Sequence, residues 1–331
     1  MTDVILTPTV TPEEVKFDET LRPQTLTDFV GQPRLKKSLG IALDAAAKRH
    51  QAVDHILLYG PPGLGKTTLA HIIAKVQGGN IHVTAGPALT RAGDLAALLT
   101  NLEGNDVLFI DEIHRLPTTV EETLYSAMED GRLDIVLGKG PAARTVNLEL
   151  KPFTLVGATT RYGALSAPLR SRFGIIGKLE YYNPVDLIKV ITRSAKILGI
   201  SIDPDAAHAL ALRSRGTPRI ANRLLRRARD IAEINNASAL LLSHIEETVN
   251  LLEIDPLGLD AADRDLLTLI ITHHHGGPVG LSTLASALSE DIATIEEVYE
   301  PYLIQQGLLA RTKQGRVVTT LAYTHLGLPL P

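Results

Sequence analysis

Residues 60–68 match the G-x-x-x-x-G-K-[ST] pattern of a nucleotide-binding P-loop. An apolar run at 56–59 precedes this segment and a helix-forming run at 69–74 follows it, so the order is strand, tight loop, helix. Glycines let such a loop turn its backbone N–H groups toward phosphate oxygens, and the following helix directs its positive dipole end at the same anion. We therefore expect an α/β fold built on a parallel sheet with flanking helices. The expected nucleotide-binding residues of the loop are Gly63, Gly65, Lys66, Thr67 and Thr68.

Two side chains of this loop have specific expected roles. The ammonium of Lys66 would reach the β- and γ-phosphates, and the hydroxyl of Thr67 would bind Mg²⁺. The alternative interpretation is a Gly/Pro-rich turn before a core helix. The match at every fixed position of the pattern, in the right strand-to-helix setting, argues against that alternative.

The composition excludes several classes of protein. The chain has no cysteine, which removes disulfides, thiolate zinc sites and cysteine nucleophiles together. The start of the chain lacks the pattern of a signal peptide, and no run of about 18 uncharged apolar residues occurs, so we expect a cytoplasmic protein. Residues 1–20 are polar with several Pro and Thr, and we interpret most of them as a poorly ordered arm.

We expect three domains in the 331 residues: 1–182 with the P-loop, 183–255, and 256–331. The net charge of −4 argues against a general nucleic-acid coat. Lys and Arg number 4 against 8 Asp and Glu in residues 256–331. Any DNA contact of that last domain must therefore be local.

Two further strands of the sheet end in polar residues. The apolar run 107–110 is followed by Asp111 and Glu112. This pattern indicates a buried parallel strand whose C-terminal end lies at the edge of the sheet where ligands bind. Asp111 would bind Mg²⁺, and Glu112 would orient and polarise the attacking water. The run 153–158 ends in Thr159, which could sense the γ-phosphate or that water. Together with the P-loop, these residues predict ATP hydrolysis.

A β-hairpin is expected from the strands 133–137 and 145–150 around a Gly/Pro-rich turn. Its apolar residues Val146, Leu148 and Leu150 could pack inward or be carried out to a partner. The cations Arg170 and Arg172 follow the third strand, beside a proline.

The remainder of the chain is predicted to be helical until its end. Periodicity over 185–253 predicts a small all-helical domain, in which Thr217 and Pro218 begin a helix. Arg219 then lies at a helix N-terminus, where an external anion would relieve the conflict between the cation and the helix dipole.

The last domain is predicted to have three helices before a final hairpin, at 263–272, 282–288 and 294–306. The third helix is expected to begin with a capping box formed by Thr294 and Glu297. Arg311, Lys313 and Arg316 gather at the tip of the hairpin, which suggests a winged helix. The histidines 273–275 are not expected to bind a metal, because neighbours on a helix point about 100° apart.

With these pieces in place, the chain closely resembles the RuvB family of AAA+ ATPases over residues 21–326. The most specific segments are 60–68, 108–116, 157–161, 168–174, 216–227, 276–280 and 300–307. The resemblance implies an AAA+ ATPase domain, a small helical lid and a winged-helix domain. It also implies a hexameric, ATP- and Mg²⁺-dependent DNA motor that drives Holliday-junction branch migration in recombination and repair.

The resemblance implies roles for single residues as well. Thr159 corresponds to sensor 1, Arg219 to sensor 2, and Arg172, rather than Arg170, to the finger that reaches a neighbouring subunit's γ-phosphate. Further implied nucleotide contacts are Leu21, Arg22, Glu129, Asp130, Gly131 and Tyr182. Val146 and Leu148 correspond to the docking surface for RuvA, and Arg311, Arg316 and Lys313 to DNA contacts. The resemblance also places a junction resolvase in the wider complex.

Two rival functions remain compatible with the nucleotide motifs. An ATP-switched binding protein, such as a clamp loader or a winged-helix regulator, would share the P-loop, Asp111, Glu112 and Arg172, but it would not move DNA. Residues 216–227 and 276–307 disfavour it. A protein-remodelling unfoldase would need an aromatic pore loop, and none is evident in the sequence.

Overall fold

The computed structural model describes residues 17, 19–137 and 144–330, with the side chains of 135–137 and 144–146 left out. The chain forms two compact units, one of residues 22–180 and one of residues 181–331 with the N-terminal 1–21. Most of the arm expected at 1–20 lies outside the described residues. Among the described helices, none combines the length and apolar character that crossing a membrane requires.

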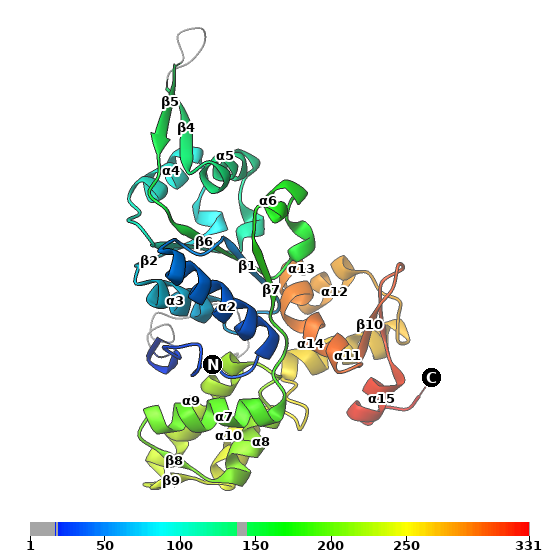
Figure 1. The fold of residues 1–331 in the computed structure, drawn as a ribbon. Helices are drawn as coiled ribbons and strands as arrows, with labels where there is room; N and C mark the ends of the chain where they lie inside the picture. The colour runs from blue at the N-terminus through cyan, green and yellow to red at the C-terminus, as the bar shows by residue number, and fades with distance from the viewer. Residues whose placement is uncertain (1–16, 18, 138–143, 331) are drawn as a thin grey trace. The chain divides into compact units, whose positions relative to one another are not determined.

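A five-stranded parallel sheet forms the centre of the first unit (Figure 1). Its strands are β1 (Ile56–Tyr59), β2 (Ile81–Ala85), β3 (Val107–Asp111), β6 (Thr154–Thr159) and β7 (Ile175–Lys178). They lie in the order β2-β3-β6-β1-β7, and every neighbouring pair is parallel. The predicted parallel sheet is therefore confirmed, and the carboxyl ends of β3, β6 and β1 lie side by side.

Helices cover both faces of this sheet. Helices α4 (Ala92–Thr100) and α5 (Thr118–Glu129) pack in one apolar core with alternate residues of the strands, among them Leu57 and Leu155. The other face lies against α2 (Pro33–Arg49) and α3 (Lys66–Gln77). Because successive strand residues point to opposite faces, a sheet covered on both sides needs continuous apolar runs, as β1 and β3 have.

The β-hairpin of the first unit consists of β4 (Arg132–Leu137) and β5 (Arg144–Glu149), paired in antiparallel fashion. It projects from the side of the unit that carries α4 and α5 (Figure 1). Leu148 and Leu150 are partly buried and pack against the apolar core, which is the inward arrangement. Val146 pairs with Ile135 through the backbone, and its side chain lies outside the described ones.

Four helices make up the first part of the second unit: α7 (Pro184–Ile197), α8 (Pro204–Leu212), α9 (Pro218–Ile234) and α10 (Leu242–Leu251). As predicted, the Thr217 hydroxyl caps α9 by accepting a hydrogen bond from the N–H of Ile220, and Pro218 is the first helical residue. The sequence did not indicate the short parallel pair of β8 (Ser201–Ile202) and β9 (Ala239–Leu240), because two-residue strands leave no periodicity.

The second part of this unit has the helices and hairpin of a winged helix. Helices α11 (Ala261–His274) and α12 (Leu281–Leu288) precede a continuous helical segment made of α13 (Ile292–Thr294), a π-helical turn (Ile295–Tyr299) and α14 (Glu300–Gln305). The wing consists of β10 (Leu309–Arg311) and β11 (Arg316–Val318), and α15 (Thr320–Leu326) follows it. The capping box expected at Thr294 is wrong, because the helix already begins at Ile292 with Asp291 as its N-cap residue.

A buried charge cluster joins these two parts of the second unit, and we call it the Arg215 junction (Arg215, Gly258, Asp260, Asp263 and Tyr302). Arg215 precedes α9 and is 4% exposed; its guanidinium bonds the fully buried carboxylate of Asp263 and donates from Nε to the carbonyl of Gly258 at 2.6 Å. The guanidinium of Arg215 lies 5.1 Å from the centre of the Tyr302 ring. Its Nη2 lies 3.7 Å from Oδ1 of Asp260. Burial raises the pKa of Asp263, and the nearby Arg215 charge opposes that rise.

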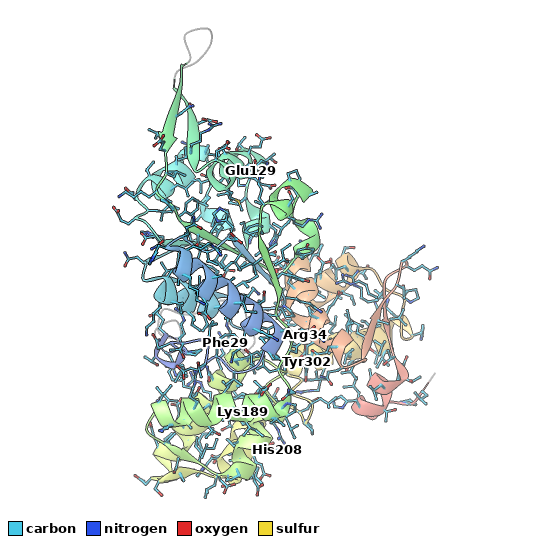
Figure 2. The ribbon with its side chains drawn as sticks, in the orientation of Figure 1. Phe29, Arg34, Glu129, Lys189, His208 and Tyr302 are labelled. Atoms are coloured by element: carbon cyan, nitrogen blue, oxygen red, sulfur yellow. The ribbon has the colours of Figure 1, made fainter. Side chains whose placement is uncertain are left out.

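The connecting segment approaches so closely that only glycine fits at one position. Gly258 has φ +80°, and a Cβ there would lie 2.7 Å from the carbonyl oxygen of Arg213. The hydroxyl of Tyr302 (Figure 2) donates to the carbonyl of Leu257 at 2.5 Å. The connection between the two parts is thus a packed contact with defined hydrogen bonds.

Arg215→Met is expected to lower the free energy of unfolding of this unit by about 3–5 kcal/mol, because it leaves the carboxylate of Asp263 buried without its ionic partner. Circular dichroism during denaturant unfolding measures the change. The matched control is Arg227→Met on α9, where the ion pair with Asp230 is at the surface and its loss costs about 0–1 kcal/mol. Equal losses in the two variants would contradict a stabilising role of the Arg215 junction.

Candidate functional site

The P-loop connects β1 to α3, and its three glycines at positions 60, 63 and 65 all have positive φ, of 143°, 79° and 102°. Two of them also have no room for a side chain. A Cβ on Gly60 would lie 2.5 Å from the carbonyl oxygen of Leu179, and one on Gly65 would lie 2.9 Å from the buried ring of Phe29 (Figure 2). The segment before β1 therefore packs directly on the loop, a point that the sequence left open.

Lys66 is the first residue of α3 and is 7% exposed. Its ammonium lies across the loop and donates to the carbonyl oxygens of Gly60 at 2.7 Å and Pro61 at 2.9 Å. Thr67 and Thr68 are half-buried in the first turn of the helix. A lysine and a helix N-terminus on a glycine-rich loop form a site for a phosphate group.

The sheet brings the other predicted residues to the same edge. Asp111 is the last residue of β3, Thr159 is the last residue of β6, and Thr159 pairs with Tyr59 at the end of β1. Ligands of open α/β sheets bind at this edge, outside the carboxyl ends of the strands. Asp111 and Thr67 have oxygen atoms of the kind that Mg²⁺ prefers as ligands. The positive charge of the buried Lys66 can pair with a negatively charged phosphate. The residues present therefore fit a magnesium nucleotide.

Glu112 lies just beyond Asp111 in a left-handed conformation, with φ 47° and ψ 47°. Its Oε2 accepts hydrogen bonds from the hydroxyl of Thr160 at 3.1 Å and from the backbone N–H of Thr160 at 3.4 Å. Burial opposes ionisation, but the His114 hydrogen bond, the Lys66 ammonium and the Thr160 N–H outweigh it and hold the pKa of Glu112 below its usual value. The carboxylate is therefore ionised at neutral pH, which a general base requires.

His114 belongs to this cluster, although we did not select it from the sequence. Its Nδ1 lies 2.8 Å from the hydroxyl oxygen of Thr159 and 3.2 Å from Oε2 of Glu112, and its side chain is 7% exposed. The only signal in the sequence is its place two residues after the acidic pair. A contact to Thr159 across the sheet edge leaves no local pattern.

Arg172 ends the short helix α6 (Ala167–Ser171) and is held against α5. Its guanidinium donates to Glu129 Oε2 at 3.0 Å and to the carbonyl of Pro168 at 2.7 Å, and it lies 4.3 Å from the centre of the Tyr125 ring. Figure 2 labels Glu129 at this end of α5. The structure thus groups two predicted nucleotide contacts, Arg172 and Glu129, on one surface.

The neighbouring predicted residues differ from Arg172 in their surroundings. Asp130 pairs with Arg132 at 3.1 Å, and Gly131 has φ +61° at the turn into β4. Arg170 instead lies over the Tyr162 ring, 5.3 Å from its centre.

The remaining predicted nucleotide contacts divide between the two units. In the first unit, Nη1 of Arg22 lies 2.8 Å from Nε2 of His71 on α3. In the second unit, the carbonyl of Leu21 accepts a hydrogen bond from Arg193 at 2.6 Å, and the N–H of Tyr182 donates to the carbonyl of Gly216 at 2.8 Å. Arg219 lies in the first turn of α9.

The wing places Arg311 and Arg316 opposite each other, and both bond the same carboxylate. Glu300 of α14 is fully buried; its Oε1 accepts from Nε of Arg316 at 2.5 Å and its Oε2 from Nη2 of Arg311 at 2.5 Å. Arg316 is 13% exposed and Arg311 is 47% exposed, whereas Lys313 lies exposed in the turn. The sequence showed a cluster of cations but not the carboxylate that partly neutralises it.

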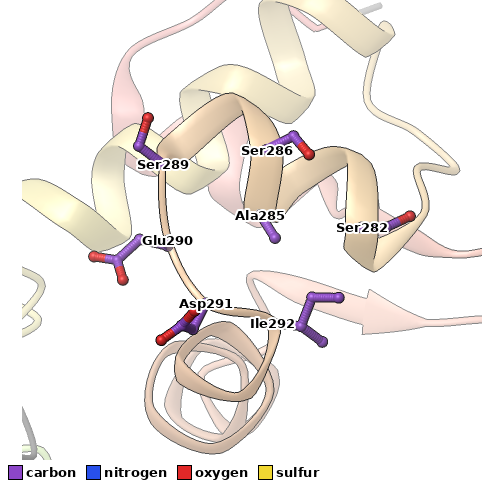
Figure 3. Close-up of a pocket in the computed structure, with 7 residues that line it drawn as sticks. All are labelled: Ser282, Ala285, Ser286, Ser289, Glu290, Asp291 and Ile292. Atoms are coloured by element: carbon purple, nitrogen blue, oxygen red, sulfur yellow. The ribbon is translucent and has the colours of Figure 1, made fainter.

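The helical face beside the wing is acidic. A hollow of about 490 Å³ lies at the turn between α12 and α13, and Figure 3 shows Ser282 and Ser286 of α12 with Glu290 and Asp291 from the turn around it. No Lys or Arg occurs between residues 265 and 310. This face is therefore unsuited to phosphate, and the wing is the basic element of this part of the chain.

Comparisons with known proteins agree over nearly all of residues 21–327. A family model for the P-loop domain of the Holliday junction DNA helicase RuvB matches residues 21–179, the model for the RuvB AAA lid domain matches 182–255, and that for the RuvB C-terminal winged helix domain matches 256–327. The solved structure of the Thermotoga maritima RuvB Holliday junction branch migration motor is 52% identical, with a TM-score of 0.87; the match covers 94% of this chain and 100% of that one. A mutant form of the same protein is also 52% identical, covers 94% and 99%, and has a TM-score of 0.88.

Proposed function

We propose that this chain, which belongs to the RuvB family of Holliday junction DNA helicases, uses ATP hydrolysis to drive branch migration at four-way DNA junctions. The observation that carries the proposal is that Lys66 at the start of α3, Glu112 just after β3 and Thr159 at the end of β6 lie at one edge of the sheet, in a chain that also has the family's lid and winged helix. The domain boundaries 1–182, 183–255 and 256–331 remain predictions. A cytoplasmic location also stays a prediction.

Each residue of the site has a proposed part in hydrolysis. Lys66 and the backbone of the P-loop hold the phosphates, and Thr159 orients the γ-phosphate or the attacking water. Glu112 accepts a hydrogen bond from that water and polarises it. When bound, Mg²⁺ neutralises charge on the phosphates, and Thr67 and Asp111 are its proposed ligands.

We propose that Arg172 acts on the nucleotide of a neighbouring copy, so that hydrolysis depends on assembly into a hexameric ring. Arg172 follows the P-loop by some hundred residues and comes after the last strand that carries a nucleotide group, so reaching its own γ-phosphate would be awkward. Glu129 and Tyr125 hold its guanidinium at the surface of α5, which supports a role at a subunit contact. The roles of Leu21, Arg22, Glu129, Asp130, Gly131, Tyr182 and Arg219 at the nucleotide are proposals from the family resemblance.

The projecting β4–β5 hairpin is the proposed docking surface for a RuvA-type protein. Leu148 and Leu150 are only partly buried against the core, and the proposed contact is made by Val146 and Leu148, as the family resemblance implies. A junction resolvase in the wider complex is a proposal from the family resemblance alone.

DNA contact is proposed to occur through phosphates at the wing. The acidic turn at Glu290 and Asp291 opposes entry of the following helix into a groove, and phosphate contacts suit movement that is independent of sequence. Few cations per subunit give a weak grip that a ring multiplies.

The cations of the wing are expected to differ in their effects. Lys313→Ala should weaken DNA binding and flatten the plot of log K against log salt concentration by about 0.9, because one phosphate contact is lost. Arg316→Ala should mainly lower the thermal stability of the winged helix, because the carboxylate of Glu300 stays buried. Fluorescence anisotropy with duplex DNA and thermal unfolding measure the two effects. If Lys313→Ala left the salt dependence unchanged, the proposed wing contact would be wrong.

Movement of a synthetic four-way junction tests the proposed function. ATP-dependent branch migration, measured with and without a RuvA-type partner, is expected with the full chain and absent without ATP. If ATP is consumed and DNA is bound without movement, the chain is an ATP-switched binding protein and the proposal is wrong.

A further inference from the structure

The imidazole of His114 contacts two residues of the site through one nitrogen. Nδ1 lies 2.8 Å from the hydroxyl of Thr159 and 3.2 Å from the carboxylate of Glu112, so one ring atom links the residue that ends β6 with the proposed base after β3. At 7% exposure, the side chain is held by its surroundings. This arrangement goes beyond the family roles and has a chemical consequence.

In the neutral ring, Nδ1 carries either a proton or a lone pair, and the two forms favour different partners. The oxygen of Thr159 already accepts the N–H of Arg161 at 2.9 Å, so its own proton is available to donate. When Nδ1 has a lone pair, Thr159 donates to it, and the carboxylate of Glu112 gains no hydrogen bond from the ring. When Nδ1 carries the proton, it donates to Glu112 in a charge-assisted hydrogen bond. The hydroxyl of Thr159 then donates elsewhere.

The backbone of Glu112 is fixed by contacts on both sides, and its carboxylate lies beside the imidazole of His114. A non-glycine residue with positive φ is strained and persists only where its surroundings determine it. Here the N–H of Glu112 donates to Asp111 Oδ1 at 3.0 Å. The carbonyl of Glu112 also lies so close to Gly86 that a Cβ there would meet it at 2.5 Å.

We propose that His114 is a positioning residue that links Thr159 to Glu112. When the hydroxyl of Thr159 turns to the γ-phosphate or the attacking water, Nδ1 carries the ring proton and holds the carboxylate of Glu112 in place for that water. When Thr159 donates to the ring, the proton is on Nε2 and Glu112 loses this support. The ring loses a proton to water at one nitrogen and gains one from water at the other.

This inference rests on the proposed ATPase function, and three variants of the full chain test it. The amide of Asn lies close to the place of Nδ1, the amide of Gln extends to the place of Nε2, and Ala has neither. His114→Ala and His114→Gln should lower kcat by about 10- to 100-fold, the usual effect of losing a partner that orients a catalytic group. His114→Asn should keep most of the kcat. The dissociation constant of a slowly hydrolysed ATP analogue should be unchanged in all three.

A double variant, one control variant and a measurement of stability separate this role from a structural one. Since Thr159 and Glu112 act through the same ring, His114→Ala combined with Thr159→Val should be no slower than the worse single variant. His208→Ala, on the exposed side of α8 (Figure 2), should keep wild-type kinetics, and thermal unfolding reports any loss of stability.

Three results would overturn the inference: equal losses of kcat with Asn and Ala, additive effects in the double variant, or weaker analogue binding in step with kcat. A wild-type chain that does not hydrolyse ATP would instead refute the proposed function.

Discussion

Glu112→Gln is expected to lower the turnover number for ATP by about 10²–10⁴-fold, the usual contribution of a positioned general base, and to leave the affinity for ATP nearly unchanged. Gln has the same size as Glu and can still bond the hydroxyl of Thr160, so the loop keeps its shape. It cannot polarise a water as a carboxylate does. Steady-state hydrolysis measures kcat, and a fluorescent ATP analogue measures binding.

The control is the same substitution at an exposed carboxylate that pairs with a surface lysine. Glu103→Gln removes the contact with Lys151 and should leave kcat unchanged. If Glu112→Gln retained the turnover of the wild type, Glu112 would not be the base. A parallel loss of ATP affinity would point to a role in binding rather than in chemistry.

Arg172→Ala should abolish nearly all hydrolysis by the assembled protein, since an arginine finger contributes about 10³–10⁵-fold to turnover in other nucleotide hydrolases. Each site of a ring made only of the variant would lack the cation from its neighbour. When variant and wild-type chains are mixed, each variant chain should silence the site it faces while its own site accepts a wild-type finger. ATPase activity against mixing ratio measures this relation.

Two substitutions show whether the effect belongs to the finger or to the local packing. Arg170→Ala removes a cation from the same helix that lies over Tyr162, and it should have a small effect. Glu129→Gln removes the ion pair of Arg172 but keeps the cation, so it should lower the rate far less than Arg172→Ala does. A homogeneous Arg172→Ala protein with the wild-type rate would refute action on the neighbouring site.

Features governed by local pattern could be predicted from the sequence. The P-loop needs glycines in one order before a helix, and the two strands that end in Asp111 and Thr159 are continuous apolar runs. In a parallel sheet such ends share one edge, so the placement of Asp111 and Thr159 at the same edge follows from the fold class, which is confirmed. The Thr217 cap and the wing were predictable for the same reason, because a few neighbouring residues determine each.

Features that depend on distant residues could not be predicted. In the sequence, Glu300 is simply one acidic residue of a predicted helix. Its burial beneath Arg311 and Arg316 is seen only in the packing of the wing on α14. The contact of His114 with Thr159 depends on the order of the strands in the sheet. The hydrogen bond of Arg215 is made to a segment more than forty residues away in the chain. The helix begins at Ile292 and not at Thr294, because a helix begins where the chain turns, which the motif alone does not fix.

The Arg215 junction has a mechanical consequence. A flexible linker between two domains lets one rotate independently of the other, whereas a rigid connection makes them rotate together. Because Arg215 and Asp263 form a buried ion pair across the connection and Gly258 brings the two backbones into contact, we expect any rotation of the α7–α10 helices to be transmitted to the winged helix.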